Sequence, residues 1–128
     1  METKTLNQEV EFKVKPHEVY EAFMDEKKHA EFTGSEATVS REVGGKFNIY
    51  GSITGENLEL EQDKKIVQTW RYEDWPEGHY SKITLVLEET DNGTKVTFTH
   101  EDIPEDKYED IKKGWNDYYW NPMKEMFE

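Results

Sequence analysis

The segment KKGWNDYYWNPM, Lys112–Met123, places four of the largest side chains in the sequence within six residues, Trp115, Tyr118, Tyr119 and Trp120. Trp115 and Tyr119 are one helical turn apart, and apolar residues continue this spacing on both sides. The pattern predicts a long C-terminal helix with a wide apolar face. Because the four rings cannot all share one stripe of a helix, we expect Tyr118 or Trp120 to be exposed.

Proline and glycine indicate where this helix begins and where it is weak. Pro104 stands where a first-turn proline is tolerated, so the predicted helix begins there. Gly114 costs a helix roughly 1 kcal/mol relative to alanine, which indicates that a strand or a ligand closely approaches its backbone. Pro122 lacks the N–H that would bond to the carbonyl of Tyr118, so we expect a bend there.

The sequence ahead of this helix has the two-residue alternation of β-strands. A first alternating run, Thr5–Val14, is followed by a helical region between Pro16 and Gly34. From Ala37 to Asp102 six segments alternate, separated by turns rich in glycine, asparagine and aspartate. The six segments are ATVSREV, KFNIYGSI, ENLELEQ, KIVQTWRYEDW, YSKITLVLEE and TKVTFTHED. Links this short predict an antiparallel meander.

This order predicts an α+β fold in which a curved antiparallel sheet of six to seven strands wraps around the long C-terminal helix, with short helices after the first strand. We expect residues 1–128 to form one domain and the C-terminal helix to be the cover of the open sheet face. Because a rod and a curved sheet differ in shape, an internal cavity is expected between them. Its candidate lining residues are Trp70, Trp75, Tyr80, Phe98, Trp115, Tyr119 and Met123.

Composition excludes several classes of function. The 29 acidic and 16 basic residues give a formal charge of −13, which repels nucleic acids and anionic membranes. The sequence has no cysteine, which excludes disulfides, thiolate catalysis and cysteine-based zinc sites. It also shows no signal-peptide pattern and no apolar run long enough to span a membrane, so we expect a cytoplasmic protein.

The polar candidates lie at the end of the fourth of these segments and in the turn that follows it. None of the four histidines has a metal-ligand spacing from another, so we expect neither a metal nor a cofactor. Asp74 and His79 could form an acid–base pair, or the turn between them could simply carry a surface histidine. Arg71 could hold an anionic group of a ligand. If Trp70 points inward instead, Arg71 points outward and pairs with an acid; the strand register decides.

Six stretches covering nearly the whole chain, in order, resemble a known family. The sequence is similar to the bacterial homologues of the C-terminal domain of the activator of the heat-shock-protein ATPase, within the helix-grip superfamily of START domains and the birch-pollen allergen. The matching stretches are VYEAFMDEKKHAEFTG, VGGKFNIYGSITGENLEL, IVQTWR, DWPEGHYSKITLVL, GTKVTFTH and GWNDYYWNPMKEMF. The resemblance implies a helix-grip fold around a cavity. It also implies that the eukaryotic relatives stimulate a chaperone ATPase with a second domain, for which we expect no counterpart here.

Three functions follow as hypotheses. The first is a non-enzymatic domain that encloses a small apolar or aromatic molecule between sheet and helix, with its rings as walls. The second, implied by the resemblance, is a module that binds a chaperone through its acidic surface. The third is a cyclase- or hydrolase-type enzyme on the same fold, with Arg71, Asp74, His79 and Tyr80 as the residues to mutate first.

Overall fold

The structure is a computed structural model that describes residues 2–127. Within that range seven strands form one antiparallel sheet, in the spatial order β1-β7-β6-β5-β4-β3-β2. The strands are β1 (Thr3–Phe12), β2 (Ala37–Val39), β3 (Lys46–Ile49), β4 (Ile53–Glu61), β5 (Lys65–Tyr72), β6 (Ser81–Thr90) and β7 (Gly93–Pro104). The helical elements are α1 (Pro16–Met24), α2 (Glu26–Thr33), the 3₁₀ turn η1 (Glu105–Lys107), α3 (Tyr108–Gly114), the π-helix η2 (Trp115–Trp120) and α4 (Asn121–Met126).

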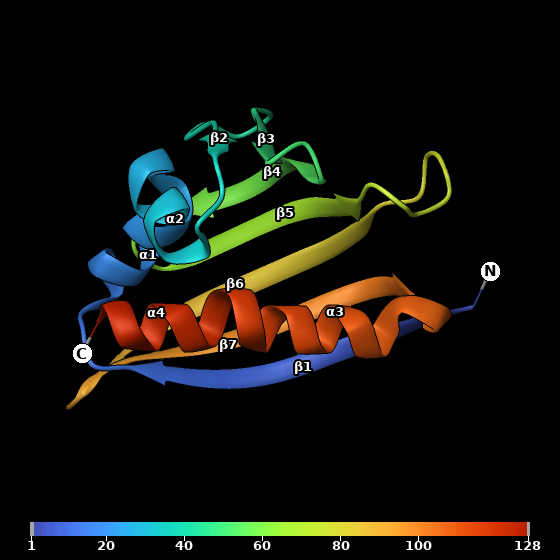
Figure 1. The fold of residues 1–128 in the computed structure, drawn as a ribbon. Coiled ribbons are helices and arrows are strands. Elements are labelled where there is room, and N and C mark those ends of the chain that lie inside the picture. The colour runs from blue at the N-terminus through green and yellow to red at the C-terminus, as the bar shows by residue number, and fades with distance from the viewer. Residues whose placement is uncertain (1, 128) are drawn as a thin grey trace.

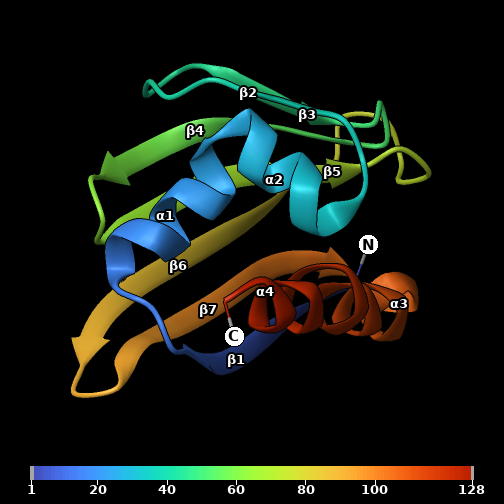
Figure 2. The same ribbon diagram turned by 60° about the vertical axis from the view of Figure 1, so that its left-hand side comes forward.

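The helices all lie against one face of the curved sheet (Figure 1). The run from α3 to α4 follows β7 and β1, while α1 and α2 lie over the strands nearer the other edge (Figure 2). The predicted helix-grip architecture is therefore confirmed. The expectation that the C-terminal helix alone covers this face is wrong, because a seven-stranded sheet is wider than one helix and the α1–α2 pair covers the remainder.

Local sequence explains the α1–α2 pair. Pro16 occupies the first helical position of α1, where its missing N–H costs nothing. The side chain of Asp25 caps α2 by accepting a hydrogen bond from the backbone N–H of Lys28 at 3.0 Å. Gly34 ends α2 in a left-handed conformation, with φ 74°. The predicted helical region thus splits at Asp25 and ends at the predicted glycine.

The β3–β4 hairpin differs from the prediction, which treated the segment KFNIYGSI as one strand. Tyr50 and Gly51 have φ values of 54° and 74°, and the N–H of Ser52 donates to the carbonyl of Ile49 at 3.0 Å. Two consecutive left-handed residues form the tight turn that joins twisted antiparallel strands. Tyrosine is unusual in this conformation, which is why the sequence pattern did not reveal the turn.

The C-terminal helical run begins later than predicted. Pro104 still belongs to β7, where it pairs with Thr3 of β1. The 3₁₀ turn η1 follows, and regular α-helix starts at Tyr108. The pairing of β1 with β7 extends the last strand to the proline, so Pro104 precedes the helix rather than standing inside its first turn.

The centre of this run, η2, winds as a π-helix. The N–H of Asn121 donates to the carbonyl of Asn116, five residues back instead of four. The wider turn brings Trp120 back over Trp115, and their rings stack with centroids 5.5 Å apart. Both tryptophans are buried, while Tyr118 is 65% exposed. Of the two residues considered for the exposed position, Tyr118 is the exposed one, because the π-helix turns Trp120 inward.

Pro122 explains where the π-helix ends. It stands in the first turn of α4, directly after the widened segment. Because a proline has no N–H, the hydrogen-bond ladder is interrupted at this point whichever helix type precedes it. The irregularity predicted for the Pro122 region is present as η2, a π segment rather than a simple bend.

Candidate functional site

An open cleft of about 460 Å³ lies between the strands β3–β5, the end of α2 and the C-terminal helix. Its walls are mainly apolar and carry seven aromatic residues: Tyr50, Trp70, Tyr72, Trp75, Trp115, Tyr118 and Tyr119. Ile49, Ile53 and Ile111 add aliphatic surface, and Asp74, Lys107 and Asp110 supply its charged groups. This size and apolar lining are typical of small-molecule sites.

The space behind these rings is nearly filled. A void of only about 10 Å³ lies between Phe23, His29, Gln68 and the inner sides of Trp115 and Tyr119, which is room for about one water molecule. The expected space between sheet and helix is therefore an open cleft beside the helix, and not a large enclosed interior cavity.

A chain of hydrogen bonds fixes Trp115 to the sheet. The indole N–H of Trp115 donates to Nδ1 of His100 at 3.1 Å, so the ring proton of His100 sits on Nε2. That Nε2–H donates to Oγ of Ser81 at 2.7 Å, and the Ser81 hydroxyl donates to the carbonyl of Trp70 at 3.0 Å. Every polar group in this buried chain has a partner, so it holds one tryptophan wall of the cleft in a defined position.

Burial keeps His100 uncharged. The ring is fully buried, and this burial lowers the pKa of His100 to about 3, since a charged imidazolium would lose its hydration. A neutral ring is also what the hydrogen bonds need, because Nδ1 must accept from Trp115. His100 therefore has a positioning function beneath the cleft rather than a proton-transfer function in it.

A second histidine holds Tyr119. The carbonyl of Phe23 can only accept, so Nδ1 of His29 carries the proton and donates to it at 3.2 Å. Nε2 of His29 then accepts from the Tyr119 hydroxyl at 2.9 Å. Burial lowers the pKa of His29 and raises the pKa of Tyr119, so both groups stay neutral. This bond ties the π-helix to α2 across 90 positions of the sequence.

The rim of the cleft carries two exposed tyrosines, one from each wall. Tyr50, in the β3–β4 turn, is 70% exposed and keeps its unusual φ of 54°. Tyr118, on η2, is 65% exposed. Strained backbone is tolerated most often at functional positions, and large exposed rings beside a groove are typical of binding surfaces.

Gly114 also faces the cleft, and no strand packs against it. A methyl group added at Gly114 would meet only Cδ2 of Tyr118, at 3.9 Å. The close approach expected from the presence of a glycine is therefore not made by another part of residues 2–127. The space above Gly114 is part of the cleft.

The structure separates the predicted apolar lining residues into three groups. Trp70, Trp75, Trp115 and Tyr119 line the cleft together. Phe98 and Met123 lie fully buried in the core beneath it. Tyr80, half exposed, lines a different depression over β3–β5.

The predicted polar residues do not form one cluster. The sheet register turns Trp70 inward and Arg71 outward, as the second alternative stated. Within residues 2–127 Arg71 pairs with no acid; its guanidinium donates to the carbonyl of Trp75 at 2.6 Å, which closes the β5–β6 loop. His79 contacts the carbonyl of Asp102 at 2.8 Å. Only Asp74 of the three reaches the cleft.

Two buried donors near this loop lack partners within residues 2–127. They are Nε of Arg71 and the indole Nε1 of Trp75, whose ring lines the cleft. Buried donors without partners are uncommon in folded proteins.

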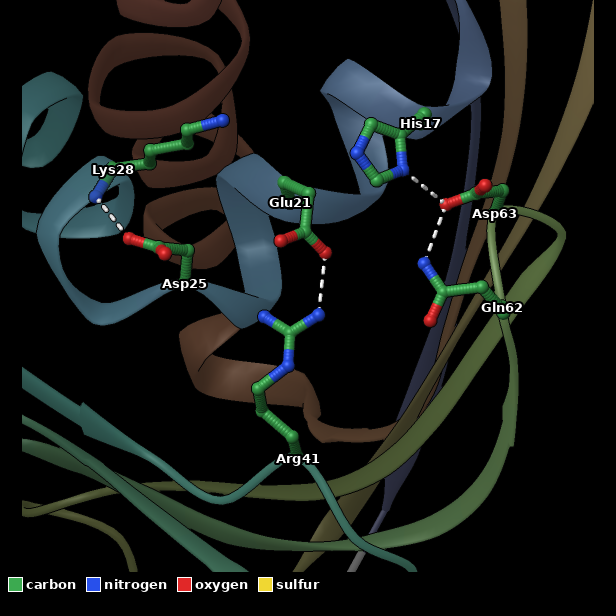
Figure 3. A network of polar contacts seen from close by, with 7 residues as sticks. All are labelled: His17, Glu21, Asp25, Lys28, Arg41, Gln62 and Asp63. Carbon is green, nitrogen blue, oxygen red and sulfur yellow. Dashed lines mark hydrogen bonds and ion pairs between the residues drawn. The ribbon is translucent and has the colours of Figure 1, made fainter.

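Polar contacts hold α1 in place at the sheet, and the Asp25 cap of α2 lies beside them (Figure 3). His17 of α1 contacts the carboxylate of Asp63 in the β4–β5 turn at 2.9 Å. The Glu21 carboxylate accepts from the guanidinium of Arg41, which follows β2. These contacts connect α1, which directly precedes α2, with two separate loops of the sheet.

Other surface features fit a ligand less well. A depression of about 650 Å³ beside β1 is lined mainly by lysine and glutamate side chains, and one of about 580 Å³ around Tyr80 is lined mostly by residues with polar side chains, three of them threonines. In the described part of the chain, no group of three or more His, Asp or Glu side chains is arranged to hold a metal ion. None of the helices of residues 2–127 combines the length and apolar character needed to cross a membrane.

Sequence reasoning did not identify His100, Ser81 or His29 as site residues. Ser81 precedes Ile83 and Leu85 at two-residue spacing, and His100 follows Val96 and Phe98 in the same way. This alternation was a signal that both polar side chains point inward. No local sequence pattern indicates the hydrogen bond between His29 and Tyr119.

Comparison with known proteins gives consistent matches. The family described as Activator of Hsp90 ATPase homolog 1-like protein matches residues 13–128. The human protein named Activator of 90 kDa heat shock protein ATPase homolog 1 is 34% identical over 117 residues, which are 91% of this chain and 35% of the human one. The homologue from Dictyostelium discoideum is 37% identical over 98% of this chain and 33% of its own. The chain thus spans about a third of the length of these relatives.

A solved structure resembles nearly the entire chain. The crystal structure of PFC0360w, an HSP90 activator from Plasmodium falciparum, matches with a TM-score of 0.88 and 33% sequence identity. The match covers 95% of this chain and 94% of the Plasmodium chain. The sheet and helices that build the cleft are thus shared by a protein of similar extent.

Proposed function

The chain belongs to the family of Activator of Hsp90 ATPase homolog 1-like proteins, and we propose that it is a non-enzymatic domain that binds a small apolar or aromatic molecule. The binding site is the cleft between the sheet and the C-terminal helix. The observation that carries this proposal is the 460 Å³ space with seven aromatic residues in its walls. We also propose that residues 1–128 form one domain, since a single buried core joins the sheet to all the helices.

The cleft walls are held in place before any ligand arrives. His100 fixes Trp115 and His29 fixes Tyr119, both through buried hydrogen bonds. Rings that are already ordered lose little conformational freedom on binding, so less of the contact energy is spent on ordering them. This rigidity supports a binding site rather than an accidental surface gap.

The arrangement of polar groups favours binding over catalysis. General acid–base catalysis needs a titratable group within reach of the bound molecule. The two histidines with lowered pKa values, His29 and His100, lie beneath the rings with both ring nitrogens of each bonded. Asp74 and His79, the candidate acid–base pair, have different partners, Lys107 and the carbonyl of Asp102.

The proposal is tested with prodan, a neutral dye whose fluorescence increases in apolar surroundings. We expect one molecule to bind per chain and to quench tryptophan fluorescence. The variant Gly114→Leu places a side chain in the cleft and should abolish binding. Lys112→Leu is the matched control, because Lys112 is exposed on the same helix, and it should bind normally. Failure of the folded wild-type protein to bind, or equal binding by both variants, overturns the proposal.

A second candidate function is association with an Hsp90-class chaperone. It is favoured by the names of the relatives and by the Plasmodium HSP90 activator, which this fold matches over nearly its full length. The formal charge of −13 suits a partner with a basic face. Pull-down with such a chaperone at low and high salt, followed by an ATPase assay, tests it. A salt-sensitive complex that raises ATPase activity supports the association; absence of any complex rejects it.

A further inference from the structure

We infer that the cleft selects organic cations, small molecules that carry an alkylammonium group on an apolar or aromatic body. The inference rests on the proposed binding function and adds the charge of the ligand. It depends on three features of the described residues: the ring faces in the walls, the charged groups at the mouth and the charge of the whole chain.

The ring faces are the first feature. The π-face of an aromatic ring carries partial negative charge and attracts a cation placed over it, most strongly for tryptophan. Trp70 and Trp115 lie with ring centroids 6.0 Å apart and tilted by 37°, while Tyr119 lies 4.6 Å from Trp115. Tyr118 adds an exposed ring at the rim. A cationic group at the rim of this cleft therefore meets the rings of Tyr50 and Tyr118, which are 70% and 65% exposed, while Trp70, Trp115 and Tyr119 are buried behind them.

The charged groups at the mouth are the second feature. The charged side chains in the lining of the cleft are those of Asp74, Lys107 and Asp110. Nζ of Lys107 pairs with the Asp74 carboxylate at 3.1 Å and also feels the charges of Asp106 and Asp110, so one cation faces the two carboxylates of the lining. Across residues 2–127 no lysine, arginine or histidine lies within ion-pair distance of Asp110. The uncompensated charge at the mouth is therefore negative.

The charge of the chain is the third feature. A formal charge of −13 gives the surface a negative potential that concentrates cations near it and lowers the local concentration of anions. An anionic ligand would have to overcome this potential, the ring faces and Asp110 together. A neutral apolar ligand would gain only the burial of its surface. A cation on an apolar body gains from the burial, from the ring faces and from Asp110.

Three probes of nearly equal size test the charge. They are benzyltrimethylammonium, its neutral carbon isostere neopentylbenzene, and the anion benzylphosphonate. Affinities are measured by tryptophan fluorescence titration, and the site is located by the amide chemical-shift changes of Gly114 and Tyr118. We expect the cation to bind about tenfold more tightly than the neutral isostere, and the anion to bind most weakly.

Two variants with the same change in net charge distinguish the effect of the charge at the cleft mouth on cation binding from the effect of the net charge of the chain. Asp110→Asn removes the Asp110 carboxylate from the lining of the cleft. Asp91→Asn removes a carboxylate from the exposed turn between β6 and β7, outside the cleft. Asp110→Asn should weaken the cation about threefold to tenfold more than Asp91→Asn does and leave the neutral isostere unaffected.

Each outcome has a defined meaning. Equal or tighter binding of the neutral isostere or the anion overturns the inference but leaves the proposed ligand site intact. Equal effects of the two variants on cation binding also overturn it, because the selectivity would then come from net charge alone. If none of the three probes binds to the folded protein, both the inference and the proposed function fail.

Discussion

The indole N–H of Trp115 donates to Nδ1 of His100 across 3.1 Å, which joins the C-terminal helix to the last strand of the sheet. The two residues are 15 positions apart in the sequence. The bond fixes the orientation of the Trp115 ring, which lines the cleft. It is also the contact whose loss is easiest to measure.

Replacing His100 with phenylalanine should destabilise the protein by about 2–4 kcal/mol, since the buried N–H of Trp115 and hydroxyl of Ser81 each lose a partner. Urea unfolding monitored by circular dichroism measures this loss. His17→Gln is the control, because His17 lies at an exposed contact with Asp63. Equal stability of the two variants would show that the buried hydrogen-bond chain contributes little.

Stability should fall as the pH falls below the ordinary histidine pKa of 6.5. The unfolded chain then binds protons at His29 and His100, whereas the folded chain does not, because burial lowers both pKa values, to about 3 for His100. His100 contributes a slope that approaches about 1.4 kcal/mol per pH unit, and His29 adds a slope of the same sign. Above the ordinary pKa this contribution is constant and fully present.

Urea unfolding at a series of pH values, from about 6.5 down to about 4.5, measures this slope before most carboxylates are protonated. The variant His100→Phe lacks one of the two rings with a lowered pKa, so its stability should depend less steeply on pH than that of the wild type. A slope identical to that of the wild type would mean that His100 is protonated in the folded protein at these pH values.

Neighbouring rings on η2 should differ sharply in their contribution to stability. Trp120 is buried and stacks on Trp115, and its N–H donates to Oε1 of Gln8 at 2.8 Å. Trp120→Ala should therefore lower the free energy of unfolding by about 3–5 kcal/mol. Tyr118→Ala, at an exposed position, should change the free energy of unfolding by no more than about 0.5 kcal/mol. Comparable losses for both would contradict the π-helix, because in a regular α-helix Trp120 turns away from Trp115.

Gly114→Ala should stabilise the protein by roughly 1 kcal/mol, because alanine is the better helix former and the added methyl group enters open space. Gly55→Ala is the opposite case, since a methyl group there would collide with the carbonyl of Thr69 and the ring of Phe47. Thermal unfolding of both variants measures the difference. A loss of stability in Gly114→Ala would mean that the space above this glycine is already filled.

Much of the fold could be predicted from the two periodicities in the sequence. Two-residue alternation located the strands, and the ring spacing located the C-terminal helix, because both patterns reflect burial on one face. The β3–β4 turn escaped this reasoning since its first left-handed residue, Tyr50, is not a usual turn former. The division of the sheet face between two sets of helices also escaped it, because width and curvature arise only when all strands are assembled.

The candidate site was predicted in part. The tryptophans and Tyr119 could be identified by their size and position, whereas the inward side of β5 depended on a register that alternation alone does not define. The polar partners of the rings were missed for a different reason. His29 and Tyr119 are 90 positions apart, and a contact of that kind follows from the packing of α2 against the C-terminal helix, which no local pattern specifies.

A crystal structure of the protein with bound prodan tests the cleft as a ligand site most directly. We predict density for one dye molecule between Trp70, Trp115 and Tyr118, in contact with Cα of Gly114. Density for the dye at another place, such as the depression beside β1, or an empty cleft at saturating dye concentration, would contradict this account.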